Sequence, residues 1–565
     1  MSTPGDDPAN AVQPAYQTAA GARAAASLLL LRDGAEGLEV LMMVRPEREG
    51  DQRGGAAVFP GGVLDARDRA AHAHCLGRDD AQASRQLGLA EGGLDYLVAA
   101  VRETFEEVGL LLAQPLGGAT LDLAALRPWR ARLQAGSAGM AECCAAAGVQ
   151  LDLRGLVYCS HWLTPPGPQK RFDTRFFAAL APAGQHAEAD RGEAMELMWI
   201  SPARALDPAL GLKLLPVTRV ILTELGVHAD AASALQAMRQ RSEVPLIMPR
   251  RALTARGPGV VMPHELAYAE VGRLDPEGRG DVHATLLAGR GVRLSGRVLR
   301  ITAPNPGPMT GPGTNSYLVG GGDGRWTLID PGPVSEPHGQ ALLGALAEVG
   351  GRLERILVTH THRDHSPGAA ALALATGAPV WGRVADHPEW QDPHFAPDHV
   401  PAHGERFAAG PGATLRVLHT PGHASNHLCY LLEEERLLFT GDHVMQGSTV
   451  VINPPDGDMA VYLRSLQALL DEPLDWLAPG HGFLVAQPYA VLRGLISHRL
   501  RREAKVLAAL RGHGPGAVEA LVEAVYDDVP ARLHGVAQRS LLAHLLKLQA
   551  DGAAACDDGD RWSAA

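Results

Sequence analysis

The chain of 565 residues lacks the long apolar runs that a membrane-spanning helix requires. No apolar stretch approaches the roughly 18 residues needed to cross a bilayer, so we expect no membrane partner. The first residues are acidic and rich in proline, without the basic region and apolar core of a secretory signal. These absences predict a cytoplasmic protein.

Cysteine and positive charge are also scarce. The six cysteines have neither the spacing of a zinc site nor that of a disulfide framework, which favours a reducing compartment. The net charge of −12 argues against a surface devoted to nucleic acid. Aromatic residues make up only 5% of the chain, but hydrophobic residues make up 46%, enough for buried cores. The length predicts several domains.

Metal-ligand side chains are concentrated in the segment from Thr359 to His365, which reads THTHRDH. The apolar run before it predicts the end of a buried strand, and the Ser-Pro-Gly and alanines after it predict a helix. His360 and His362 are two apart, so in extended backbone they point the same way. Asp364 and His365 then lie at the corner between strand and helix. Buried imidazoles and carboxylates are costly unless they are bonded or coordinated, and both suit zinc and its neighbours, so the segment predicts a pair of metal ions.

Three more residues of ligand type follow downstream, namely His423, Asp442 and His481. Each stands in a glycine-marked turn just after an apolar run, and open α/β sheets place their sites at such strand ends. Taken singly, each is more often an ordinary turn residue. Taken together and in this order, they favour one shared site.

These motifs resemble the metallo-β-lactamase superfamily, which has a four-layer αββα sandwich. The resemblance implies one metal held by His360, His362 and His423, a second held by Asp364, His365 and His481, and Asp442 as the bridge between them. A ligand set with a bridging aspartate and no cysteine resembles that of glyoxalase II and ribonuclease Z. It does not resemble that of true β-lactamases. The implied cofactors are two zinc ions, or iron or manganese. The implied chemistry is hydrolysis by a hydroxide that the metal pair activates, with Asp364 also a candidate catalytic proton acceptor.

Several neighbouring residues have two interpretations each. The segments Gly313–Leu318 and Leu328–Gly332 resemble the opening strands of the same domain. Asp330 then either orients a ligand loop or caps a turn before proline. His427 and His443 are close to ligands in sequence and either support them or are simply packed or solvated.

A second motif, RETFEEVGL from Arg102 to Leu110, ends a helical pattern that begins near Leu94. Glu103, Glu106 and Glu107 are three and four apart and share one helix face. Carboxylates this close repel one another unless a cation neutralises them, and such hard oxygen ligands suit magnesium or manganese. The alternative is a solvated acidic face.

With the Phe-Pro-Gly-Gly turn that ends at Gly62, this helix resembles the Nudix box. The resemblance implies hydrolysis of a diphosphate joined to another group, with magnesium or manganese on the glutamates and Glu103 as the proton-transfer residue. Arg102 lies 40 positions after Gly62, where the family spacing is about 14, so about 26 residues loop out. Leu94 stands where the box carries a further glutamate. The segments Arg171–Phe177 and Met198–Pro202 resemble the branch that includes coenzyme A diphosphatases, whose coenzyme A signature is matched only at Arg45 and Gly55.

Three helical segments, Ser497–Glu503, Gly516–Tyr526 and Arg532–Ala550, with a β-wing, resemble a winged helix. The His-Arg-x-x-Arg-Glu run and this module resemble the β-lactamase-like protein 2 family, some members of which are endoribonucleases. The basic residues of the run, Arg499, Arg501, Arg502 and Lys505, either contact phosphates, or Arg499 pairs with Glu503 along the helix.

The predicted fold class is multidomain α/β and α+β: a Nudix α/β/α sandwich, a metallo-β-lactamase αββα sandwich and a small winged helix. The predicted boundaries are 1–20 (disordered), 21–241 (Nudix), 242–292 (connector without chemistry), 293–490 (metal domain) and 497–565 (winged helix).

The predicted protein is a metal-dependent hydrolase of an ester, thioester or phosphodiester, whose Nudix domain cleaves a nucleoside-diphosphate-linked compound. Candidate partners are a nucleotide, an acyl-CoA or RNA. The alternative is an endoribonuclease acting on single-stranded RNA, with the Nudix domain as a non-catalytic binding or regulatory module. The sequence leaves the oligomeric state open.

Overall fold

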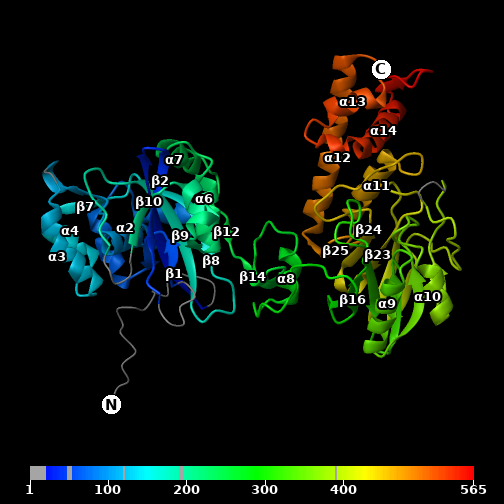
Figure 1. Ribbon diagram of the computed structural model, residues 1–565, viewed down its shortest axis with the longest axis horizontal. Coiled ribbons are helices and arrows are strands. Elements are labelled where there is room, and N and C mark those ends of the chain that lie inside the picture. The colour runs from blue at the N-terminus through cyan, green and yellow to red at the C-terminus, as the bar shows by residue number, and fades with distance from the viewer. Residues whose placement is uncertain (1–20, 48–53, 119–120, 190–195, 388–390) are drawn as a thin grey trace. The chain divides into compact units, whose positions relative to one another are not determined.

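A computed structural model describes residues 21–47, 54–118, 121–189, 196–387 and 391–565. The predicted disordered segment 1–20 lies outside the described residues. The chain forms two compact units, Met1–Arg250 and Arg251–Ala565 (Figure 1). Among the described helices, none combines the length and the apolar character that crossing a membrane demands.

The first unit is built on a nine-stranded sheet in the order β11-β3-β2-β1-β9-β8-β12, with β10 beside β2 and β4 beside β1. Its strands are β1 (Ala22–Gly34), β2 (Gly37–Val44), β3 (Ala56–Val58), β4 (Gly61–Val63), β8 (Val157–Leu163), β9 (Arg171–Leu180), β10 (Glu196–Ile200), β11 (Lys213–Leu214) and β12 (Leu246–Ile247). The strand β1 pairs in parallel with β9 and antiparallel with β2. Gly34 of β1 pairs with Gly37 of β2, so the turn that joins these two strands follows Gly34.

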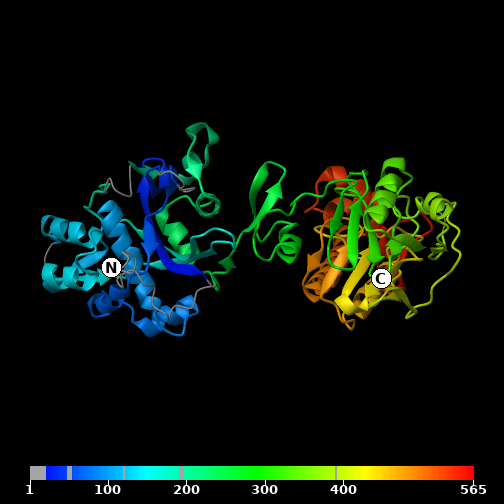
Figure 2. The same cartoon turned by 90° about the horizontal axis from the view of Figure 1, so that it is seen from below.

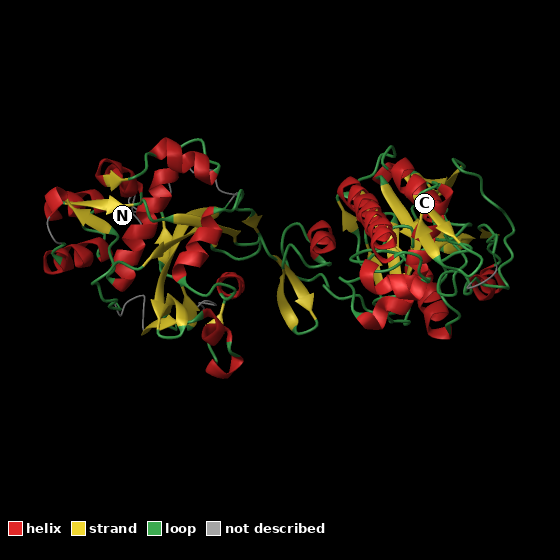
Figure 3. Ribbon diagram, turned by 90° about the horizontal axis from the view of Figure 1, so that it is seen from above, coloured by secondary structure: helices red, strands yellow, loops and turns green. Residues whose placement is uncertain are grey.

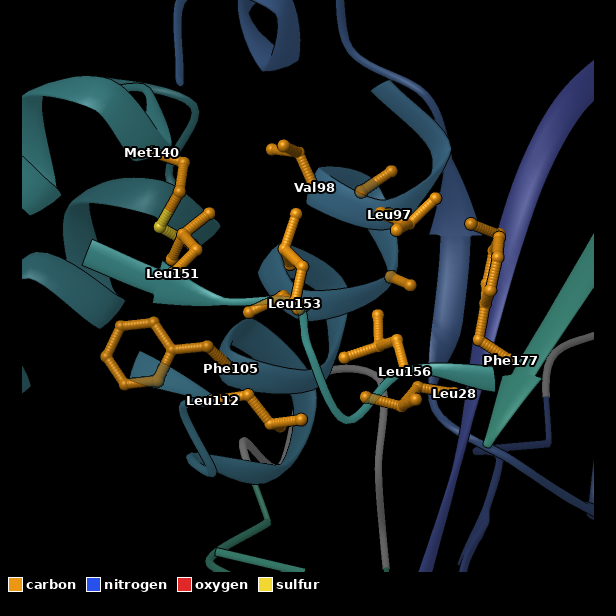
Figure 4. Packing of buried hydrophobic residues seen from close by; sticks show 14 of the residues in the cluster. Leu28, Leu97, Val98, Phe105, Leu112, Met140, Leu151, Leu153, Leu156 and Phe177 are labelled. Carbon is orange, nitrogen blue, oxygen red and sulfur yellow. The ribbon is translucent and has the colours of Figure 1, made fainter. Parts of the chain in front are cut away.

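The predicted Nudix helix is α2 (Gly93–Val108), which lies almost wholly buried against this sheet. Leu97 and Phe105 of α2 share one apolar cluster with Leu28 of β1 and Phe177 of β9 (Figure 4). Leu94, at the position of the missing box glutamate, is only 2% exposed and belongs to the same cluster. That position therefore serves the core.

The predicted insertion before α2 is folded, as η2 (Ala66–His74), β5 (Cys75–Leu76) and α1 (Asp80–Leu87). A small sheet, β5-β7-β6, and several helices complete the unit. They are β6 (Ala113–Pro115), η3 (Leu116–Gly118), α3 (Leu123–Gln134), α4 (Met140–Ala147), β7 (Val149–Asp152), α5 (Pro202–Leu206), η4 (Pro208–Leu210), α6 (Pro216–Leu225) and α7 (Ala231–Arg239).

The second unit contains two six-stranded sheets (Figure 2). The first consists of β15 (Gly291–Arg293), β16 (Val298–Thr302), β17 (Asn315–Gly320), β18 (Arg325–Ile329), β19 (Arg352–Leu357) and β20 (Val380–Trp381) in that order. The second consists of β21 (Arg406–Gly410), β22 (Ala413–His419), β23 (Leu428–Leu432), β24 (Leu437–Gly441), β25 (Trp476–Pro479) and β26 (Val485–Ala486) in that order.

Three apolar clusters show how these sheets are layered. Leu357, Val417 and Phe439 belong to the cluster between the two sheets. Ile356, next to Leu357, faces the other way, towards α9 (Glu336–Glu348) and α10 (Ala369–Thr376). The far side of the second sheet packs against α11 (Met459–Leu469) and α12 (Pro488–His513). The order helix, sheet, sheet, helix confirms the predicted αββα sandwich (Figure 3).

The residues predicted as a connector are divided between the two units. The strand β12 pairs with β8 of the first unit, whereas the hairpin of β13 (Arg250–Thr254) and β14 (Gly257–Val261) leads into α8 (Tyr268–Leu274) in the second. Glu270 of α8 forms two hydrogen bonds with the buried Arg300 of β16, at 2.7 and 2.8 Å. The amide of Leu484 also donates to Glu270. The α8 segment is therefore an integral part of the metal-domain core.

The C-terminal module has the elements of the predicted winged helix: α12, α13 (Val518–Val525), α14 (His534–Ala550) and the paired strands β27 (Ala554–Cys556) and β28 (Trp562–Ala564). The helix α12 begins at Pro488 and not at Ser497, so it runs unbroken through the predicted boundary. Its first half contributes Leu492 to the core of the metal domain, and its second half contributes Val506 and Leu510 to the core of the winged helix. One helix spans both modules because each half carries its own apolar face.

Candidate metal centre

The seven candidate ligands of the second unit come together from loops that follow four strands. The segment from His360 to His365 follows β19, and the other three residues follow β22, β24 and β25. Three groups of donor atoms lie within 4.8 Å of one another: His360, His362 and His423; His360, His365 and Asp442; Asp364, His365 and His481. The described residues contain no other such group of histidine, cysteine or acidic side chains.

Asp442 lies between the two predicted triads. Its Oδ1 is 3.4 Å from Nε2 of His365 and 3.3 Å from Nε2 of His481. Its Oδ2 faces the other way, 3.8 Å from Nε2 of His423. One carboxylate thus presents a separate oxygen to each triad, as a bridging ligand does.

Four polar atoms at this point are buried without any hydrogen-bond partner. They are Nε2 of His360, Nε2 of His365, Nε2 of His481 and Oδ1 of Asp442. An unsatisfied buried polar atom costs about 1–3 kcal/mol, and native structures contain few of them. Since all four converge, and imidazole and carboxylate are good ligands for zinc, iron or manganese, the donor set fits a pair of such ions.

The second nitrogen of most of these rings is occupied by the protein. Nδ1 of His423 lies 2.8 Å from the carbonyl of Val451, Nδ1 of His481 lies 3.2 Å from the carbonyl of Gly313, and Nδ1 of His365 lies 2.8 Å from Asp330. Donation of Nδ1–H to these acceptors leaves the lone pair on Nε2, which points into the centre. His362 differs, because its Nδ1 is the atom that faces Nε2 of His423, at 3.1 Å.

Asp330 supports the segment that carries the ligands. Its carboxylate accepts hydrogen bonds from the backbone N–H of Thr359 at 2.7 Å and from the Thr359 hydroxyl at 2.8 Å, besides the bond from His365. Asp330 is buried and has a positive φ of 54°. Of the two interpretations of this residue, the structure supports the one in which it orients a ligand.

Two of the glycines that mark the ligand turns are required by space. A Cβ atom on Gly480 would lie 2.7 Å from Oδ1 of Asp442 and 2.7 Å from Cε1 of His365. A Cβ atom on Gly441, which has a φ of 45°, would lie 2.6 Å from the hydroxyl of Thr359. A side chain at Gly480 would push two ligands apart, and one at Gly441 would displace Thr359, which precedes the ligand His360.

The electrostatics differ among the ligands. Burial lowers the pKa of His365 and of His481, but the carboxylates of Asp364 and Asp442 outweigh it and raise both, that of His481 to about 9, so a metal ion would compete with protons for these two rings. Burial, with the nearby His423, lowers the pKa of His362 to about 3, so its ring is neutral. Burial opposes the ionisation of Asp364, but His365 and His481 outweigh it and hold the pKa of Asp364 below its usual range. The side chain of Asp364 is 26% exposed, whereas that of His365 is fully buried. Water therefore has access to the centre on the Asp364 side.

A polar network around the centre has no counterpart in the sequence analysis. Asp456 accepts from Gln391 at 3.0 Å and from Ser425, and the hydroxyl of Thr361 donates to Gln391 at 2.6 Å. The hydroxyl of Thr314 donates to Asp364 at 3.1 Å. Thr361 and Thr314 lie within segments already singled out, but Gln391, Ser425 and Asp456 are far from them along the chain, so no local motif marks these three.

His427 and His443 are both completely buried but belong to none of the donor groups. The ring of His427 stacks on that of His360, with centroids 5.0 Å apart. Burial lowers the pKa of His443 to about 3. Packing behind the ligands is therefore the interpretation that the structure favours for both.

The glutamates of α2 have a different environment. The guanidinium of Arg102 donates to Glu103 at 2.7 Å, to Glu106 at 3.3 Å and to the buried Asp68 at 2.7 Å. Glu107 accepts from the backbone N–H of Gly61 at 2.8 Å. A buried arginine therefore supplies the cation that this acidic face needs, and the face provides no group of three donors within 4.8 Å of one another.

The strand β4 packs closely on these carboxylates. A Cβ atom on Gly62 would lie 2.5 Å from the carboxylate of Glu103. Burial raises the pKa of Glu103 to about 7, although Arg102 acts in the opposite direction. Asp68, which comes from the inserted segment, was not expected from the sequence because it lies 34 positions before Arg102.

The basic residues at the winged helix are largely engaged within the protein. Arg499 is buried and donates to the carbonyl of Val450, Arg502 donates to Asp528 at 2.7 Å, and Lys505 donates to Asp527 at 2.6 Å. The expected pairing of Arg499 with Glu503 is wrong: Glu503 accepts instead from Lys547 of α14 at 2.9 Å. The side chain of Arg499 turns towards the metal domain and cannot contact phosphates outside.

Models of known families match three stretches of the chain. The NUDT19 Nudix domain matches residues 79–210, the Metallo-beta-lactamase superfamily matches 309–481, and the Beta-lactamase associated winged helix domain matches 517–562. Their order along the chain is the predicted one.

Individual relatives are similar to each half. A beta-lactamase-like protein 2 homolog from Drosophila melanogaster is 33% identical over 271 residues, covering 46% of this chain and 90% of the relative. An atrochrysone carboxyl ACP thioesterase from Aspergillus chevalieri is 34% identical over 271 residues, covering 46% and 83%. A solved NUDIX hydrolase from Alicyclobacillus acidocaldarius is 26% identical, with a TM-score of 0.33, covering 39% of this chain and 97% of its own.

Proposed function

Because the chain belongs to the metallo-beta-lactamase superfamily, as a beta-lactamase-like protein 2 relative with a Nudix domain ahead of it, we propose that this hydrolase cleaves thioesters or related acyl esters at a two-metal centre. The observation that carries the proposal is the convergence of four buried, unpartnered donor atoms on one point. No serine or cysteine nucleophile is needed in such a site.

The proposed ligand set follows the three donor groups. His360, His362 and His423 would hold one ion; Asp364, His365 and His481 would hold the other; and Asp442 would bridge them. Zinc, iron or manganese would suit these donors. A bound pair of ions would lower the pKa of a shared water molecule and polarise the oxygen under attack.

Groups of the protein itself would orient the ligands and accept the proton. Asp330 and the carbonyl of Val451 fix the directions of His365 and His423. Asp364 is the candidate proton acceptor, because its carboxylate is ionised and 26% exposed at the open side of the centre. The hydroxyl of Thr314 holds this carboxylate in place.

The choice of an acyl substrate rests on charge. The chain has a net charge of −12, and three of the four basic residues considered for phosphate contact, Arg499, Arg502 and Lys505, are bonded internally, whereas Arg501 is exposed. Relatives named as carboxyl ACP thioesterases support the same choice. The winged helix itself is the feature that favours the alternative, cleavage of single-stranded RNA.

We propose that the Nudix unit hydrolyses a nucleoside-diphosphate-linked compound, with coenzyme A-like molecules among the candidates. Glu103 supports this proposal, since a carboxylate with a pKa of about 7 is suited to proton transfer near neutrality. The arrangement of Arg102 between the glutamates does not itself fit magnesium or manganese, so dependence on either ion stays a prediction. The competing interpretation is a non-catalytic binding module.

A substrate panel on the purified protein tests both proposals. Acyl-CoAs, single-stranded RNA and nucleoside diphosphate derivatives would be offered to the parent, to His362→Ala and to Glu106→Gln. We expect His362→Ala to lose thioester hydrolysis and to keep diphosphate hydrolysis. Hydrolysis of every substrate by His362→Ala would rule out the two-metal proposal. Diphosphate hydrolysis that is absent in the parent, or unchanged in Glu106→Gln, would favour the binding module.

A further inference from the structure

Three consecutive residues, Val450, Val451 and Ile452, link a candidate metal ligand to the C-terminal module. The carbonyl of Val451 is 2.8 Å from Nδ1 of His423. This contact fixes the plane of the His423 ring and directs Nε2 into the metal centre. The position of the Val451 carbonyl therefore controls one ligand of the first triad.

Each neighbour of Val451 is held by a helix of the winged-helix module. The carbonyl of Val450 accepts from the guanidinium of Arg499 in α12. The backbone N–H of Ile452 donates to the hydroxyl of Ser540 in α14, at 3.4 Å. The residue that aligns His423 is thus fixed on one side by α12, which spans both modules, and on the other by α14 of the winged helix.

The burial of Arg499 is unusual for a charged residue. It is only 3% exposed, and no carboxylate among the described residues forms an ion pair with it. Its guanidinium lies 5.6 Å from the ring centre of Tyr462, whose hydroxyl donates to the carbonyl of His443, next to Asp442. Burying a guanidinium without an ion-pair partner is costly, so general stability is a poor explanation for its presence.

We infer that Arg499 and Ser540 are positioning residues for the metal centre, through which the winged helix sets the orientation of His423. The inference rests on the proposed two-metal function. It gives the C-terminal module a role at the active site that does not require nucleic acid.

The effect is confined to one of the two metal positions. His423 belongs to the group with His360 and His362 only. In the other group, the Nδ1 atoms of His365 and His481 are held by Asp330 and Gly313, inside the sandwich. Loosening the Val450–Ile452 segment should therefore weaken the first ion and leave the second in place.

The full-length chain offers a matched control in the same helix. Arg502 is also buried in α12 and also caps a carbonyl, that of Val525, but its contacts stay within the winged helix. Metal-free parent, Arg499→Ala, Arg499→Lys and Arg502→Ala would each be titrated with zinc, and affinity and stoichiometry would be measured. We expect Arg499→Ala to bind one ion about 10- to 100-fold more weakly, Arg499→Lys to recover part of the loss, and Arg502→Ala to bind as the parent does.

A second readout needs no metal. Backbone hydrogen exchange of the peptide that contains Val450–Ile452 would be compared in the metal-free proteins. We expect faster exchange in Arg499→Ala and Ser540→Ala and parental exchange in Arg502→Ala. Equal effects of Arg499→Ala and Arg502→Ala, or equal loss of both ions, would overturn the inference. A parent that binds no metal would instead refute the proposed two-metal function, while the exchange data would still decide whether Arg499 positions the segment.

Discussion

Each of the two units gathers acidic or metal-ligating side chains in a buried place. The two clusters differ in whether a group of the protein neutralises them. On α2, the carboxylates of Glu103 and Glu106 are neutralised by Arg102, which also binds Asp68. In the second unit, Asp442 and three imidazoles keep buried donor atoms without a hydrogen-bond partner. A cluster that satisfies itself needs no ligand to be stable. A cluster whose buried donor atoms lack hydrogen-bond partners and are all aimed at one point fits a bound cation.

The sharpest test of this contrast is His362→Ala. We expect thioester hydrolysis to fall by at least about a thousandfold, or about 4 kcal/mol, because a ligand of the reacting centre is lost. Bound metal, measured on the purified protein, should fall with it. Diphosphate hydrolysis by the first unit should not change. An equal loss of both activities would show that the units do not work as separate centres.

The opposite test removes the internal cation of the first unit. Arg102→Ala removes the ion-pair partner of two buried carboxylates, Asp68 and Glu103, so we expect the first unit to lose about 3–5 kcal/mol of stability. Hydrogen exchange of peptides from α2 and from β19 would report the two units separately. Exchange in β19 should stay parental. A parental α2 would mean that Arg102 does not neutralise this face.

The response to pH should also differ between the units. Burial lowers the pKa of His338 in α9 to about 4. In the unfolded chain this pKa is about 6.5, so stability that is fully present above pH 6.5 is lost as the pH falls through 4. The total is about 3 kcal/mol. Denaturation of the metal-free protein between pH 7 and 4 should therefore have a shallower pH dependence in His338→Gln.

Glu103, in the first unit, should change stability with pH in the opposite direction. Its pKa is raised by burial, so the folded first unit retains a proton that the unfolded chain has lost. Stability of this unit should fall as the pH rises from 4.5 through 7, and Glu103→Gln should reduce that fall. If the stability of both units changed in the same direction with pH, the environments assigned to His338 and Glu103 would be wrong.

The smallest expected effect separates the two metal positions. Asp330→Asn replaces the acceptor of three hydrogen bonds at Thr359 and His365 by an amide. We expect the ion held with His365 to bind about 10- to 100-fold more weakly. Zinc titration of this variant should show weaker binding of the ion held with His365. The same titration of Arg499→Ala should show weaker binding of the other ion. Loss of the same ion in both variants would show that the triads are not independent.

Much of the candidate site was predictable because the ligands are local to strand ends. The THTHRDH segment, His423, Asp442 and His481 each follow an apolar run and stand beside a glycine, and the structure brings all of them together. The αββα layering was predicted from the resemblance that these motifs carry, and the structure shows its physical basis, since neighbouring residues such as Ile356 and Leu357 face opposite cores. The predicted start of α12 at Ser497 was wrong because the apolar pattern of its first half belongs to another core.

The sequence by itself determined the order of the modules, the reaction class and the candidate ligands, because each is encoded in a short segment. Only the tertiary structure decided how those residues are supported and neutralised. Arg102 reaches Asp68 across 34 positions, and Arg499 reaches Val450 across 49. Such partners meet only after folding, and a charge or a carbonyl binds whatever partner the packed chain brings within hydrogen-bond distance. The sequence therefore determined which side chains form the two sites, and the fold decided that one is internally paired and the other has donor atoms to offer.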